Sequence, residues 1–138
     1  MADLTFEPYS TRIHWSAPAG FDHWQEMLSE FMQALAINCT KIGTVIGHIK
    51  ALSLFEGQKF ICLSAIDRNH PITLEGTVPA GLKQLDLSLN ILVFGFSHDL
   101  LAQIAARIAD EVSVKWHVKA EIQPEPEKHP PHASAGYN

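Results

Sequence analysis

The residues best suited to chemistry are His48 and Lys50, in a segment rich in β-branched residues that predicts a strand. Alternate side chains of a strand share one face, so these two groups project together. Later predicted strands carry three more polar residues, Glu75, Asp86 and Asn90. These residues lie beside His48 and Lys50 if the polar sides of all these strands form one sheet face that no helix covers. This predicted ligand-binding set suits an anionic or metal-bearing ligand, although a solvated sheet face has the same pattern.

An enzymatic interpretation of the same residues uses His48 as acid or base together with Glu75 or Asp86. The sequence contains no phosphate-binding loop, no Gly-x-Ser-x-Gly and no His-Glu-x-x-His. Cys39 and Cys62 follow no disulfide or zinc pattern and are predicted to be buried thiols. We therefore expect binding rather than catalysis, and no catalytic residue is assigned.

A metal-binding interpretation comes from the eight histidines of the chain. Imidazole is the commonest metal ligand in proteins. His129 and His132 lie three positions apart near the C-terminus, with His117 upstream, and they form the predicted metal set for a divalent ion. Closed metal sites need four ligands, and two histidines between prolines also occur where no metal binds. No other cofactor is expected.

Length and charge limit the class of protein. The chain has 138 residues, which suits one domain, and a formal net charge of -5 from ten basic and fifteen acidic residues. Nucleic-acid binding requires clustered Lys and Arg, so a nucleic-acid partner is not expected. The sequence has no apolar run long enough for a membrane helix and no signal-peptide pattern at its start, so we expect a cytoplasmic protein without a membrane partner.

Hydrophobic periodicity predicts the first half of the fold. A strand is expected within Leu4–Ser16, which ends before a Pro-Ala-Gly turn. A helix follows to about residue 37. Strands are then expected over Thr44–Phe55 and Lys59–Ile66, joined as a hairpin by the turn Glu56–Gln58. The helix is predicted from an apolar stripe at three- and four-residue steps, made of Phe21, Trp24, Leu28, Phe31 and Leu35.

The second half continues with alternating patterns. Strands are predicted over Ile72–Val78 and Leu85–Phe94, and Ser97 is the predicted N-cap of a second helix. From Ser113 the sequence alternates again, which predicts a last strand up to Ile122. Residues 1–122 are thus expected to form one domain, and residues 123–138 a flexible tail rich in proline and histidine.

The order of these elements predicts an α+β fold of the ferredoxin-like sandwich type. In that arrangement an antiparallel sheet carries two helices on one face. Its other face is left free to dock a ligand or a partner.

Four segments also resemble the C-terminal domain of CobW-type GTPases, a metallochaperone-like family linked to cobalamin and zinc handling. The resemblance covers most of residues 4–112, and its best match is the segment from Leu92 to Leu100. It implies a domain that contacts a separate GTPase, a client protein or the delivered metal. The GTPase domain of the family, with its phosphate loop and cysteine motif, is absent from this sequence. The matching segments are Phe6–Trp15, Phe21–Ile37, Gly47–Leu52 and Leu92–Leu100.

Three hypotheses therefore follow from the sequence. The first is a non-catalytic binding or accessory domain that docks onto a partner protein, such as a separate GTPase, or onto a second copy of itself. The second is a metal-binding protein that uses its histidines. The third is a small enzyme with His48 as the acid or base.

Overall fold

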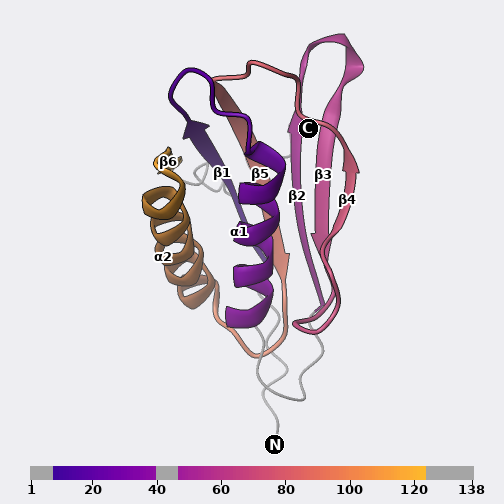
Figure 1. The fold of residues 1–138 in the computed structure, drawn as a ribbon. Coiled ribbons are helices and arrows are strands. Elements are labelled where there is room, and N and C mark those ends of the chain that lie inside the picture. Colours follow the sequence, from indigo (N-terminus) through magenta and orange to yellow (C-terminus); the bar gives the residue numbers. More distant parts are fainter. Residues whose placement is uncertain (1–7, 40–46, 124–138) are drawn as a thin grey trace, which may run out of the picture.

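The computed structural model describes residues 8–39 and 47–123, which form a six-stranded antiparallel sheet and two α-helices (Figure 1). Across the sheet the strands lie in the order β4-β3-β2-β5-β1-β6. A single 3-10 turn, η1, joins β2 and β3. The elements are β1 (Tyr9–Ser16), α1 (Trp24–Asn38), β2 (His48–Leu54), η1 (Glu56–Gln58), β3 (Phe60–Ala65), β4 (Thr73–Gly76), β5 (Gln84–Leu92), α2 (His98–Trp116) and β6 (Lys119–Ile122).

The connections confirm the predicted α+β class. Both β1 and β2 pair antiparallel with β5, so they run parallel to each other, and α1 connects them. In the same way β1 lies between β5 and β6, which α2 connects. The inner order β6-β1-β5-β2 is compatible with a ferredoxin-like sandwich, and the hairpin strand β3 with β4 widens the sheet beyond β2.

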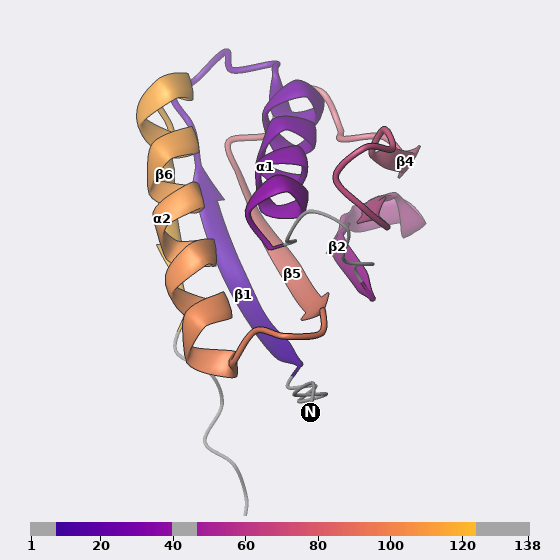
Figure 2. The same ribbon diagram turned by 90° about the horizontal axis from the view of Figure 1, so that it is seen from below.

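Both helices lie side by side over one face of the sheet (Figure 2). Strand side chains alternate between the two faces, and those facing the helices are mostly apolar and buried. This alternation fixes the core between the sheet and the helices. Its fully buried strand members are Ile13, Trp15, Ile49, Ala51, Ile61, Leu63, Leu87, Leu89 and Ile91.

Helix α1 confirms the predicted helix because its apolar stripe is the buried stripe. Trp24, Leu28 and Phe31 are buried one turn apart, and the ring of Phe31 meets Trp15 of β1 edge-to-face at 5.4 Å between centroids. The helix begins at Trp24, after the predicted start at Phe21, whose ring packs on Trp24 from the preceding loop.

The last predicted strand is wrong over its first half. Ser113 to Trp116 continue helix α2, which ends only where His117 takes a left-handed conformation (φ 58°), and β6 is reduced to Lys119–Ile122. The helix prevails because Val112 and Trp116 are spaced four residues apart and both pack on the core side. Val114 is 69% exposed on the outer side of α2.

The other elements agree with the predicted ones within a few residues. Strands β2 and β3 form the predicted hairpin, and Ser97 caps α2 by accepting a hydrogen bond from the backbone N–H of Leu100. Residues 4–7 and 44–46 of the predicted first and second strands, and residues 124–138 of the predicted tail, lie outside the described residues. Neither described helix is long and apolar enough to cross a membrane.

Candidate functional site

The face of the sheet opposite the helices, here termed the open face, carries mostly polar side chains. They follow from the strand register, since residues paired across neighbouring strands point to the same side. No described helix covers this side (Figure 2). The open face comprises Ser10, Arg12, His14 and Ser16 of β1, His48, Lys50, Leu52 and Leu54 of β2, Phe60, Cys62 and Ser64 of β3, Thr73 and Glu75 of β4, Gln84, Asp86, Ser88, Asn90 and Leu92 of β5, and Lys119 and Glu121 of β6.

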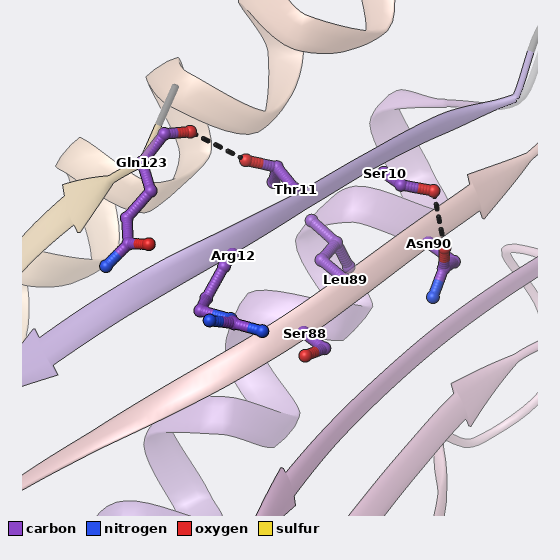
Figure 3. A pocket seen from close by; sticks show the side chains of 7 residues that line it. All are labelled: Ser10, Thr11, Arg12, Ser88, Leu89, Asn90 and Gln123. Atoms are coloured by element: carbon purple, nitrogen blue, oxygen red, sulfur yellow. Dashed lines mark hydrogen bonds between the residues drawn. The ribbon is translucent and has the colours of Figure 1, made fainter. Parts of the chain in front are cut away.

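Two residues of the predicted ligand-binding set meet at the centre of the open face. Lys50 of β2 lies directly opposite Asn90 of β5. On the other side of β5, Asn90 is opposite Ser10, whose hydroxyl donates a 2.5 Å hydrogen bond to Asn90 Oδ1 (Figure 3). This bond orients the amide so that its Nδ2 hydrogens remain available to a ligand.

The neighbouring pair, Arg12 of β1 and Ser88 of β5, lies beside Asn90 and forms the floor of a pocket. Figure 3 shows the guanidinium group of Arg12 extending towards Ser88 over the sheet. The pocket has a volume of about 410 Å³ and opens to solvent. It is lined by Ser10, Thr11, Arg12, Ser88, Leu89, Asn90 and Gln123.

A third pair on the open face joins His14 to Asp86. His14 Nδ1 lies 2.8 Å from Asp86 Oδ1, and Glu121 of β6 flanks the imidazole on its other side. The hydrogen bond to the Asp86 carboxylate raises the pKa of His14 above its ordinary value of 6.5, and the charges of Asp86 and Glu121 and a hydrogen bond with Gln84 act in the same direction. Partial desolvation opposes them.

We expect an Asp86→Asn variant to lower the pKa of His14 towards its ordinary value, because the main charge partner is lost. In the folded wild type the raised pKa means that the His14–Asp86 pair stabilises the fold fully below pH 6.5, and that this contribution disappears as the pH rises through the pKa of the folded state. NMR titration of the His14 ring measures both pKa values. Asp110→Asn on exposed α2 is the control, and an equal shift in both variants would contradict the assignment.

The remaining residues of the predicted ligand-binding set lie apart. His48 is opposite Leu92, six residues along β5 from Asp86, which corresponds to about 20 Å. Glu75 lies on β4, opposite Cys62 of β3, and both β3 and β2 separate β4 from β5. The structure therefore does not bring His48 together with either carboxylate, and the carboxylate-bound imidazole of the open face is His14 instead.

No family model, no curated protein and no solved structure matches this chain.

The predicted metal residues are only partly described. His117 is exposed at the C-terminal end of α2, while His129 and His132 lie outside the described residues. Within residues 8–39 and 47–123, no three His, Cys, Asp or Glu side chains are grouped as a metal site requires. A metal site that combines these three histidines stays a prediction.

The two cysteines occupy different environments. Cys39 is buried as predicted, and desolvation raises the pKa of its thiol to about 12, so the thiol stays protonated. Cys62 is only half-buried, on the open face, which differs from the prediction of a buried thiol. Its position follows from β3, where Ile61 and Leu63 take the buried side.

Sequence reasoning missed Arg12 and His14, although the signal for both was present. They alternate with Ile13 and Trp15 in β1, so the period of two that predicted a buried side also predicted a polar side. A ferredoxin-like order places β1 next to β5, but the sequence could not indicate the register, and only the register pairs His14 with Asp86.

Proposed function

We propose that this chain is a non-catalytic binding domain that docks through its open face. The observation that supports the proposal is that α1 and α2 cover the same side of the sheet, while side chains on the other side include exposed apolar groups beside polar ones. Exposed apolar groups that lie next to one another with polar groups around them are typical of a binding surface. We further propose that the occupant is a second copy of this chain.

The apolar part of the open face favours a protein occupant. Leu54 is 74% exposed and Phe60 is 39% exposed, and the two lie directly opposite each other on β2 and β3. Leu52 extends the same strip towards the centre of the sheet. A few buried anchor side chains supply most of the binding energy at protein interfaces, and the contacts around them exclude water.

The charges of the open face favour a second copy in particular. Three basic side chains and three acidic ones share this face, so two copies meet without net repulsion. A two-fold contact places the same surface on both sides, and mixed charge makes that surface self-complementary. The six residues are Arg12, Lys50, Lys119, Glu75, Asp86 and Glu121.

The size of the open face is sufficient for a dimer. Six strands about 4.8 Å apart, each about six residues long, give a surface of about 600 Å². Two such surfaces bury about 1,200 Å² in total, which is the lower end of the range for stable interfaces. We therefore expect a reversible dimer rather than a permanent one.

Sedimentation analysis of wild-type protein over a range of concentrations tests this proposal. The expected species at high concentration has twice the 15.3 kDa mass of one chain. Leu54→Glu buries a charge in the contact and is expected to weaken dimerisation at least about tenfold. Val114→Glu is the matched control, because Val114 is 69% exposed but lies on α2, away from the open face.

Two results contradict a second copy as the occupant: a wild type that stays monomeric at every concentration, or equal effects of the two variants.

The resemblance to CobW-type proteins adds a different occupant, a separate GTPase chain, and with it a role in metal or cobalamin handling. A purified GTPase of that family that binds the wild type and Val114→Glu but not Leu54→Glu would support docking by the open face onto that partner instead.

A further inference from the structure

The centre of the open face holds two cations that have no acidic partner of their own. Within the described residues, neither Arg12 nor Lys50 forms an ion pair or a side-chain hydrogen bond. Lys115, in contrast, pairs with Glu30 at 2.7 Å. Arg12 and Lys50 lie on the two strands that flank β5, so both residues stand on the open face on either side of the same central strand.

Hydrogen-bond donors lie between the two cations. Ser88 of β5 is opposite Arg12, and Asn90, two residues further along β5, is opposite Lys50. Because Asn90 Oδ1 already accepts from Ser10, the amide presents its N–H groups outward (Figure 3). The hydroxyl, the amide and the guanidinium belong to residues that line the pocket, and Lys50 lies next to it, opposite Asn90.

The nearest carboxylate of β5 does not neutralise this cluster. Asp86 shares the open face with Ser88, but it is bound to His14 at 2.8 Å. Glu121 flanks His14 from β6, and Glu75 lies on β4, beyond β2 and β3. The other charged residue of β6 on this face, Lys119, is basic and lies opposite Ser16. The unpaired positive charge therefore stays concentrated over β5 in a chain whose net charge is -5.

We propose that Arg12, Lys50, Ser88 and Asn90 bind an oxyanion, the carboxylate or phosphate group of a small ligand. The planar guanidinium accepts two oxygens of such a group side by side, and the lysine supplies a second positive charge. The pocket volume of about 410 Å³ lies within the range of small-molecule sites, which is about 300–1,000 Å³. All of the residues that line the pocket come from one chain, so anion binding at this site does not require the proposed dimer.

Titration of isotope-labelled protein with pyrophosphate, and separately with citrate, tests the site by NMR. The expected result is a saturable shift of the backbone amides of Arg12, Ser88 and Asn90 with at least one of the two anions. Saturation by pyrophosphate alone identifies a phosphate-bearing ligand, and saturation by citrate alone a carboxylate-bearing one. Binding is expected to weaken as salt increases, because the site is open to solvent.

Three variants make the test specific. Arg12→Gln is expected to weaken binding about tenfold or more, and Lys50→Gln about threefold or more, because each removes a charge-assisted contact. Lys83→Gln removes an equally exposed charge from the loop before β5 and is expected to leave binding unchanged. Lys50 is exposed, so its variant keeps the test valid even if Arg12→Gln does not fold.

Absence of saturable shifts with both anions would overturn the site. So would equal weakening by Lys83→Gln and Arg12→Gln, because it indicates general screening by the net charge. The same titration on Leu54→Glu separates this site from the proposed dimer. Unchanged anion binding in that variant supports a site made by one chain. Complete loss of anion binding would overturn the proposal that one chain alone forms the site.

Discussion

Replacing Phe31 by alanine is expected to lower the free energy of unfolding by about 3–5 kcal/mol. Phe31 is fully buried on α1, and its ring meets Trp15 of β1 edge-to-face. Truncation removes the buried ring and leaves a cavity between the helix and the sheet, which cannot close because strand β1 is held by β5 and β6 on both sides. A domain of this size is usually stable by about 5–15 kcal/mol, so this loss is a large part of the total.

Urea denaturation measures this effect, with an unchanged slope as evidence that the unfolding transition stays the same. Phe94→Ala is the control of the same residue type, since Phe94 is 46% exposed after β5, and its expected cost is below about 1 kcal/mol. Equal costs for the two variants would contradict the assignment of Phe31 to the centre of the core.

The spacing of apolar residues predicted those parts of the fold in which the sequence fits either the period of a strand or that of a helix, but not both. In β5, apolar residues alternate over nine positions, and in α1 the apolar stripe recurs every three or four residues. Both elements were predicted with small errors at their ends. The segment after Val112 fits two periods, because Val114, Trp116 and Val118 alternate while Val112 and Trp116 are also one helical turn apart. Packing of α2 against the core decides between them.

The candidate site was less predictable than the fold because it depends on register. Lys50 and Asn90 were predicted to share a face, and β2 does pair with β5 in a register that places them opposite each other. Arg12 reaches the same place only because β1 pairs with the other edge of β5. Long-range pairing of this kind is set by the packing of all the strands and both helices together, and no short segment of the sequence records it.

The order of the strands explains how one face can serve two purposes. The apolar strip of Leu52, Leu54 and Phe60 lies on β2 and β3, whereas the pocket with Arg12 and Ser88 lies on β1 and β5. The apolar anchors of the protein contact and the anion site therefore lie on neighbouring but different parts of the open face, although a dimer that uses the whole face covers both. This separation is why the two proposals can be tested by different variants.

The widened edge of the sheet supplies the last prediction. Gly76 ends β4 with a φ of 84°, and a Cβ atom at this position would overlap the carbonyl oxygen of Phe60 in β3. That oxygen accepts a 3.0 Å hydrogen bond from the backbone N–H of Thr77. Gly76→Ala is therefore expected to separate the four-residue strand β4 from β3 and to cost about 2–4 kcal/mol.

Gly81→Ala distinguishes the overlap from backbone strain alone. Gly81 has a similar φ of 77°, but a Cβ atom there would meet no atom within 4 Å, so its expected cost is only that of the left-handed conformation, about 1 kcal/mol. Hydrogen exchange of the Thr77 amide locates the damage, since it should accelerate strongly in Gly76→Ala and stay unchanged in Gly81→Ala. Equal costs with unchanged Thr77 exchange would mean that the close approach of Gly76 to Phe60 does not hold β4 on the sheet. Because β4 protects the outer edge of β3, its loss exposes the strand that carries Phe60 and with it one side of the proposed docking strip.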